Sequence, residues 1–203
     1  MASTPARIIL ASSSPRRREL LTQIGVTYKA LAVDVSEAPH PGETPEHYVQ
    51  RVAAEKSQMG MDLSNDGLPV LGADTEVVLD GEVLGKPRNF GQAARMLSRL
   101  SGREHRVLSA VSLRHGSHHW QALQTSLVTF RSIGADEMAA YWASGEPADK
   151  AGAYGIQGIG AVFVRHLAGS FSGVMGLPLF ETAELLRNVG IVVLEAQTAA
   201  DER

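Results

Sequence analysis

The chain has 203 residues, of which 44% are hydrophobic and 20% are charged, so the composition excludes a disordered protein and predicts one substantial core. Its 22 acidic and 19 basic residues give a formal net charge of −3, which offers no general attraction for nucleic acid. Because the chain has no cysteine, disulfides, thiolate metal sites and a cysteine nucleophile are excluded, and any metal must be held by oxygen or histidine ligands.

The first predicted elements are a short strand and a helix that begins with arginines. The apolar run at residues 8–10 is followed by a serine loop, in which Ser14 is expected to cap a helix over residues 15–25. Arg16, Arg17 and Arg18 then lie at the helix N-terminus, where the helix dipole favours negative charge. This arrangement indicates a bound anion, although an exposed basic turn paired with acidic loops is the alternative.

The remaining elements predict a mixed sheet. They are a strand within 27–37, a helix opened by residues 44 and 45, a strand, turn and strand over 68–87, a helix over 89–102, two or three strands over 105–130, a helix over 135–145 and a final helix over 178–186. Consecutive strands in the middle imply antiparallel pairing, so we predict an α/β fold with a mixed, twisted sheet flanked by helices. Residues 1–195 are expected to form a single domain, with 196–203 as a flexible tail.

Other general features bear on location and on the shape of the site. No stretch is apolar over the roughly 20 residues that a transmembrane helix needs, so we expect a cytoplasmic protein without a membrane partner. Residues 152–176 contain seven glycines, which indicates backbone bent around some other group.

An acidic residue, Asp74, lies in the middle of the apolar segment "PVLGADTEVVL". An ionised carboxylate within a buried strand is costly unless it is paired, bound to metal or protonated, and the nearby glycine leaves room for a ligand. Asp74 is therefore a catalytic candidate, and a structural pair with an arginine or lysine is the alternative. Glu76 points to the same face at a period of two, but it could equally mark the strand leaving the core.

Two lysines could join the arginines in one cationic site. Lys56 falls on the apolar side of its helix, where its stem could simply lie along the core, and Lys86 lies in the loop "GKP", where an exposed lysine is ordinary. All these cations lie near the ends of predicted elements. A polyphosphate would satisfy several of them at once.

Five segments, in order and well spaced, resemble one known family: "LASSSPRRRELL", "RVAAEKS", "VLGADTEVVLDGEVLGKPRN", "DKAGAYGIQGIGAVFV" and "GLPLFET". On these motifs the chain resembles the Maf family of nucleoside triphosphate pyrophosphatases from about residue 8 to residue 188. The resemblance implies two lobes with a central cleft, commonly in a homodimer. It also implies hydrolysis of a nucleoside triphosphate between its α and β phosphates with a divalent cation, Mg²⁺ or Mn²⁺, which gives the monophosphate and pyrophosphate.

The resemblance assigns roles to individual residues. It makes Asp74 the catalytic carboxylate that accepts a proton from the attacking water, with Glu37 and Asp74 at the metal. Positions expected to contact phosphate are Ser12, Arg17, Lys56 and Lys86. Positions associated with substrate choice are Arg16, Thr75 and Gln157.

The residues at those last three positions resemble the dTTP/UTP subgroup of the family. A glutamine side chain presents both a donor and an acceptor, so Gln157 can pair with the O4 and N3–H edge of uracil or thymine, whereas a carboxylate would suit guanine. We therefore predict a house-cleaning dTTP and UTP pyrophosphatase that could also act on modified pyrimidine nucleotides. The alternatives are a nucleotide-sensing regulatory protein in cell-division control, with incidental hydrolysis, and a purine-specific enzyme of the same family.

Overall fold

The structure is a computed structural model that describes residues 5–194. The tail predicted at 196–203 lies outside the described residues. Within residues 5–194, no helix combines the length and the apolar character required to cross a membrane.

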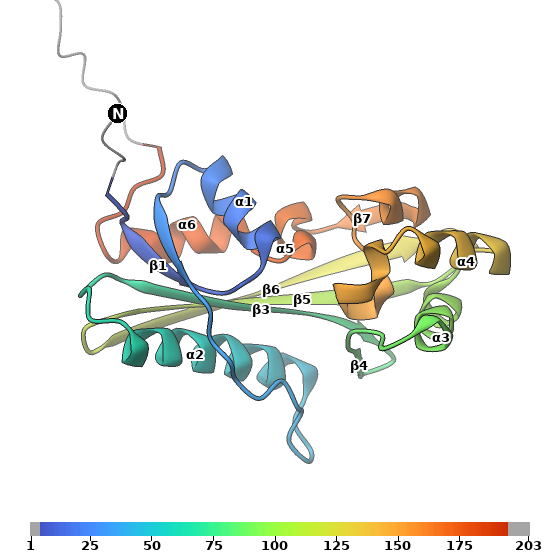
Figure 1. Cartoon of the computed structure of the whole chain (residues 1–203), viewed down its shortest axis with the longest axis horizontal. Helices are drawn as coiled ribbons and strands as arrows, with labels where there is room; N and C mark the ends of the chain where they lie inside the picture. The colour runs from blue at the N-terminus through green and yellow to red at the C-terminus, as the bar shows by residue number, and fades with distance from the viewer. Residues whose placement is uncertain (1–4, 195–203) are drawn as a thin grey trace, which may run out of the picture.

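The described chain forms strands and helices in nearly the order that the sequence predicts (Figure 1). The strands are β1 (Ile8–Ala11), β2 (Tyr28–Leu31), β3 (Val70–Leu79), β4 (Glu82–Leu84), β5 (Glu104–His115), β6 (His118–Phe130) and β7 (Val164–Ala168). The α-helices are α1 (Pro15–Gln23), α2 (Pro45–Leu63), α3 (Phe90–Leu100), α4 (Ala135–Ala143), α5 (Phe171–Met175) and α6 (Leu179–Arg187). Three short 3-10 helices are η1 (Glu146–Asp149), η2 (Ala151–Ala153) and η3 (Ile159–Phe163).

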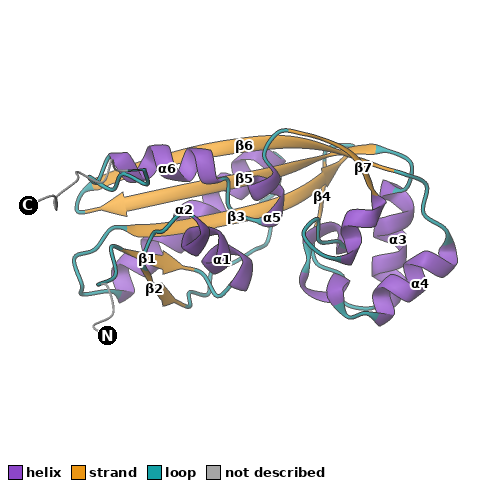
Figure 2. Ribbon diagram, turned by 90° about the horizontal axis from the view of Figure 1, so that it is seen from above, coloured by secondary structure: helices purple, strands orange, loops and turns teal. Residues whose placement is uncertain are grey.

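All the strands belong to one mixed sheet, which confirms the predicted fold class. The order is β2-β1-β3-β5-β6-β7, with β4 paired to β3 outside this path. Strand β1 runs parallel to β2 and β3, whereas β3, β5, β6 and β7 pair antiparallel as the consecutive strands predicted. Strands β3, β5 and β6 are long enough to run through both halves of the molecule (Figure 2).

Helices cover both faces of the sheet. Helix α2 lies on one face, and helices α1, α5 and α6 lie on the other (Figure 1). A glycine lets α2 approach β3 closely, because a Cβ at Gly72 would lie 2.5 Å from the carbonyl oxygen of Ala53 and from the backbone nitrogen of Ser57. The other side of β3 packs Leu71 and Ala73 into a core that includes residues of α1 and α6.

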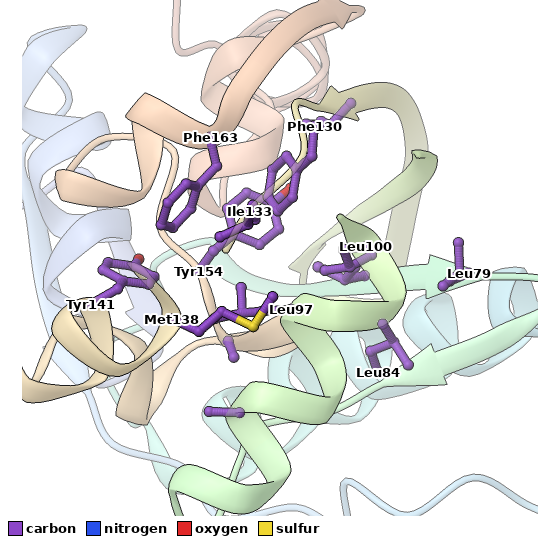
Figure 3. Close-up of a cluster of buried hydrophobic side chains, with 14 of the residues drawn as sticks. Leu79, Leu84, Leu97, Leu100, Phe130, Ile133, Met138, Tyr141, Tyr154 and Phe163 are labelled. Carbon is purple, nitrogen blue, oxygen red and sulfur yellow. The ribbon is translucent and has the colours of Figure 1, made fainter. Parts of the chain in front are cut away.

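A second core at the other end of the long strands produces a second lobe. Its members come from α3, α4, the glycine-rich segment and the ends of β3, β5 and β6 (Figure 3). The aromatic rings of Phe130 and Tyr154 meet edge to face with centroids 4.7 Å apart, and Tyr141 and Phe163 do so at 5.1 Å. Burial of these large rings stabilises the lobe. The two cores confirm the expected two-lobed shape.

Two predicted segments differ in detail from the structure. The strand expected within 27–37 is confined to β2, and the residues that follow it run without regular structure toward α2. The glycine-rich segment contains β7 and α5 in addition to bent backbone. Ser14 is the N-cap of α1 as predicted, but its side chain makes no capping hydrogen bond to the helix.

Candidate active site

The candidate site lies where one edge of β3 has no neighbouring strand. Strand β1 pairs with β3 only as far as Leu71, and β4 begins to pair at Val77. Between these points, within the described chain, that edge of β3 faces a cleft of about 330 Å³. Side chains from both faces of β3 therefore reach one cleft.

All nine residues predicted for the site line this cleft: Ser12, Arg16, Arg17, Glu37, Lys56, Asp74, Thr75, Lys86 and Gln157. They come from the β1–α1 loop, α1, the β2–α2 loop, α2, β3, the β4–α3 loop and the segment between η2 and η3. Arg18, the third arginine of the opening run, is not among the lining residues. The structure thus brings together residues that are far apart in the sequence.

Lys56 joins two carboxylates at the centre of the site. Its Nζ lies 2.8 Å from Asp74 Oδ1 and 2.7 Å from Glu37 Oε1. Lys56 and Asp74 are only 7% and 4% exposed, so both charges are removed from water and depend on each other. The odd position of a lysine on the apolar side of α2 is therefore explained by an ion pair and not by a stem that reaches solvent.

Glu37 is bonded to lysine through both carboxylate oxygens. Its Oε2 accepts a hydrogen bond from Lys86 at 3.4 Å, and Oε1 is bonded to Lys56. Burial alone would raise the pKa of Glu37, but the hydrogen bonds and charges of the two lysines outweigh it and hold the pKa below its usual value. Each of these oxygens keeps a second lone pair, so the role of Glu37 at the metal stays a prediction.

Two arginines at the N-terminus of α1 also line the cleft. Arg17 donates from Nε to the carbonyl oxygen of Gly176 at 2.8 Å and from Nη1 to Ser12 Oγ at 3.3 Å. These bonds fix the guanidinium beside the start of the helix, where backbone N–H groups and the helix dipole favour an anion. Arg16 forms an ion pair of 3.1 Å with Asp149 of η1.

Thr75 points to the opposite face of β3 from Asp74. It pairs in register with Ser109, and the two hydroxyl oxygens lie 3.0 Å apart. Ser109 donates its only hydroxyl proton to the carbonyl oxygen of Gly173 at 2.6 Å, so Thr75 must be the donor to Ser109. This chain of hydroxyl groups ties β3 and β5 to α5 beside the cleft.

The segment that carries Gln157 is held by the carboxylate of Glu146. Glu146 Oε2 accepts from the backbone N–H of Ile159 at 2.7 Å, and Oε1 accepts from that of Gly160 at 3.0 Å and from the Tyr141 hydroxyl at 2.7 Å. The Tyr141 hydroxyl in turn accepts from Gly155 N–H at 3.0 Å. The exposed side chain of Gln157 therefore stands on a braced turn at the cleft.

Comparison with known proteins identifies the family. The family model described as "Maf-like protein" matches residues 7–189. The chain belongs to the Maf-like family. A relative named "dTTP/UTP pyrophosphatase" from Methylococcus capsulatus is 59% identical over 191 residues, which cover 94% of this chain and 95% of the relative. A protein of the same name from Escherichia coli is 52% identical, covering 89% of this chain and 92% of its own.

A more distant likeness exists among solved structures. The crystal structure of a nucleoside-triphosphatase, a dITP/XTP pyrophosphatase from Mycobacterium abscessus, matches with a TM-score of 0.46 at 18% identity. The match covers 90% of this Maf-like chain and 97% of that chain.

Several lining residues of this Maf-like protein were not assigned by sequence reasoning. They are supplied by the second lobe, and include Asp149, Lys150 and Tyr154. Lys150 donates to Asp149 Oδ1 at 2.8 Å and to the carbonyl oxygen of Glu146 at 2.7 Å. These residues belong to the "DKAGAY" part of a motif that carries the family resemblance. The motif therefore pointed to this segment, but the sequence assigned no role to these three residues.

Glu76 also lines the cleft, as its period of two with Asp74 suggested. Burial raises its pKa well above the usual value, and the charges of Asp74 and Glu37 act in the same direction. Two carboxylate oxygens of this Maf-like protein, Asp74 Oδ2 and Glu76 Oε2, are buried and have no hydrogen-bond partner within residues 5–194. Such oxygens fit the oxygen-rich coordination that Mg²⁺ and Mn²⁺ prefer.

Proposed function

We propose that the cleft hydrolyses dTTP and UTP to the monophosphate and pyrophosphate with the help of a divalent cation. The observation that carries the proposal is the buried Asp74 carboxylate, which is bonded through Oδ1 to Lys56 and has no partner on Oδ2 among residues 5–194, in a cleft lined by arginines and lysines. The names of close relatives over nearly their whole length support the same substrates.

Asp74 is proposed as the group that accepts a proton from the attacking water. Lys56 fixes the carboxylate through Oδ1, so Asp74 keeps a defined position from which it can orient a water molecule. The water oxygen forms a new bond to phosphorus at the α–β anhydride, the bridging P–O bond breaks, and the proton passes to the Asp74 carboxylate. Pyrophosphate and the nucleoside monophosphate are released.

The cationic side chains balance the negative charge of the triphosphate. Arg17, fixed by Ser12 and Gly176, lies at the N-terminus of α1, and Lys56 and Lys86 line the same cleft. Groups held in place before substrate binds stabilise charge that develops during the reaction without reorganisation. A divalent cation, held by Asp74 and a second carboxylate of the cleft, would neutralise further charge on the phosphate oxygens.

Base recognition is assigned to Gln157, with Thr75 and Arg16 as further determinants. The amide of Gln157 supplies one donor and one acceptor face, which complement the O4 and N3–H edge of a pyrimidine dione. The braced turn beneath it favours a fixed orientation.

The cytoplasmic location and the homodimer remain predictions, to be checked by cell fractionation and analytical ultracentrifugation.

An endpoint assay tests the reaction. Purified protein is incubated with dTTP, UTP, CTP, GTP or 7-methyl-GTP and Mg²⁺ or Mn²⁺, and pyrophosphate is resolved from phosphate. The variant Asp74→Asn is measured beside Asp136→Asn, which makes the same change in the exposed second "GAD" of the chain. We expect pyrophosphate from dTTP and UTP, loss of at least about a thousandfold in kcat for Asp74→Asn, and unchanged activity for Asp136→Asn.

Three other results would contradict the proposal. Release of phosphate would indicate attack at the γ position, and binding without turnover would favour the regulatory protein. Unchanged selectivity in Gln157→Glu, together with a preference for purine nucleotides in the parent protein, would favour the purine-specific enzyme.

A further inference from the structure

Glu76 is a buried carboxylate with one oxygen that makes no hydrogen bond within residues 5–194. Its side chain lies in the cleft, the residue is 8% exposed, and Oε2 has no hydrogen-bond partner within residues 5–194. Asp74, which is 4% exposed, likewise has no hydrogen-bond partner on Oδ2 in the described chain. A buried carboxylate oxygen that contacts neither a donor nor a cation is costly, so these two oxygens indicate a ligand.

Lys56 and Lys86 donate no hydrogen bond to either of these two oxygens. Lys56 Nζ is bonded to Asp74 Oδ1 and to Glu37 Oε1, and Lys86 Nζ is bonded to Glu37 Oε2. Glu37 therefore has a cationic partner on each oxygen, whereas Glu76 has none on Oε2. The two unpartnered oxygens thus remain available to a cation that enters with the substrate.

The strand geometry places the two carboxylates as neighbours. Asp74 and Glu76 are two positions apart on β3, so their side chains leave the same face with Cα atoms about 7 Å apart. Two carboxylates at this spacing can share one cation between them. Thr75, which separates them in the sequence, points to the other face and does not intervene.

The chemistry of the donors favours Mg²⁺ or Mn²⁺ completed by phosphate oxygens. Such ions are held by one or two carboxylates together with water and substrate phosphates. Among residues 5–194, no group of three or more His, Cys, Asp or Glu side chains could hold a metal by itself. The nucleotide must therefore supply much of the coordination.

We propose that Glu76 is the second carboxylate that binds the divalent cation, with Glu76 Oε2 and Asp74 Oδ2 as the two protein ligands. Phosphate oxygens and water complete the shell. Glu76 is favoured over Glu37, which the sequence assigns to the metal, because each oxygen of Glu37 already has a cationic partner. The inference deepens the proposed function and rests on it for the identity of the nucleotide.

Mn²⁺ binding tests the assignment independently of turnover. Free Mn²⁺ is measured by electron paramagnetic resonance during titration of the protein, alone and with a dUTP analogue whose α–β bridge is an imido group. The variants are Glu76→Gln, which keeps the shape of the side chain, and Glu184→Gln, which changes a half-exposed surface carboxylate on α6. Melting temperatures verify that each variant is folded.

We expect Glu76→Gln to weaken Mn²⁺ binding about tenfold or more in the presence of the analogue, and Glu184→Gln to leave it unchanged. Equal Mn²⁺ affinity in Glu76→Gln and the parent protein, within about twofold, would overturn the assignment. If the analogue does not bind, the same comparison is made on the protein alone, where the same two outcomes apply. Absence of pyrophosphate release from the parent protein would instead reject the proposed function, which this titration does not measure.

Discussion

Arg16 of α1 and Asp149 of η1 form an ion pair of 3.1 Å between residues 133 positions apart, and the pair spans the cleft from one lobe to the other. The Asp149 side chain is 63% exposed, so the pair contributes little to folding. The ion pair occupies the guanidinium of Arg16. A nucleotide that binds to this guanidinium must therefore displace Asp149.

Replacement of Asp149 by asparagine should therefore favour substrate binding. We expect Asp149→Asn to lower the KM for UTP by about two- to fivefold at unchanged kcat, because an exposed pair is worth at most about 1 kcal/mol. Steady-state kinetics at low and high salt measure the effect, which should shrink as salt screens the pair. A higher KM in the variant would mean that Asp149 positions Arg16 for the substrate.

Loss of the Glu146 carboxylate should disturb base selection more than chemistry. In Glu146→Gln, one oxygen is replaced by an NH₂ group that cannot accept from Ile159 or Gly160, and each N–H left without an acceptor costs about 1 kcal/mol. We expect the ratio of kcat/KM for UTP over CTP to fall severalfold. Tyr141→Phe removes one partner of Glu146 and also the acceptor of the Gly155 N–H, so it should act in the same direction.

A selectivity ratio that stays constant in Glu146→Gln, with a folded protein, would show that the turn does not position Gln157. An equal loss of activity on all nucleotides would also show that the turn does not position Gln157. Hydrogen exchange of the Ile159 and Gly160 amides verifies that the bracing has been removed.

The close contact between α2 and β3 predicts a severe effect of a single methyl group. In Gly72→Ala, the new Cβ would lie 2.5 Å from the backbone of Ala53 and of Ser57, and neither helix nor strand can yield without loss of its hydrogen bonds. We expect a loss of about 3 kcal/mol or more in the free energy of unfolding. Urea denaturation measures it, with Gly85→Ala as the control, since a Cβ there meets nothing within 4 Å.

His105 should make stability depend on pH. Burial lowers its pKa to about 4, and its Nε2 lies 2.8 Å from the Tyr154 hydroxyl in the core of the second lobe. The unfolded chain, with a histidine pKa near 6.5, binds the proton more readily, so stability is full above pH 6.5 and falls as the pH drops toward 4. The loss is on the order of 3 kcal/mol over that range.

Melting temperatures between pH 4.5 and 7.5 measure this dependence. The double variant His105→Phe with Tyr154→Phe removes the titrating group without leaving its hydroxyl partner unpaired, and it should flatten the slope. His118→Gln, a change at an exposed histidine, should preserve the slope. An equal slope in the double variant and the parent protein would assign the dependence to carboxylates.

Sequence reasoning reached much of the site because isolated residues broke local patterns. Asp74 interrupts a buried strand and Lys56 interrupts an apolar helix stripe, and the structure pairs these two with each other. Family motifs supplied Glu37 and Gln157. The bracing by Glu146 could not be foreseen, because the glutamate looks like an ordinary charged residue until the fold brings Ile159 and Gly160 to it.

The fold was predictable to a similar degree. Antiparallel pairing of β5 and β6 followed from their alternation and the turn at Gly116, which has a positive φ of 56°. The early end of β2 did not follow from the sequence, because the pattern beyond Leu31 continues to alternate while its parallel partner β1 ends at Ala11. Strand length there is set by the neighbouring strand.

One edge of β3 is open to the cleft between Leu71 and Val77. The register between β3 and β5 therefore decides the surroundings of the side chains that the cleft exposes. Asp74 and Thr75 are adjacent, yet one meets Lys56 beneath the sheet and the other meets Ser109 above it, and both are reached from a single opening. A slip of one residue between β3 and β5 would exchange these environments, with the acid turned toward α5 and the hydroxyl toward α2. One residue inserted into β3 just before Asp74 would shift this pairing and would therefore abolish activity although every residue of the cleft is retained.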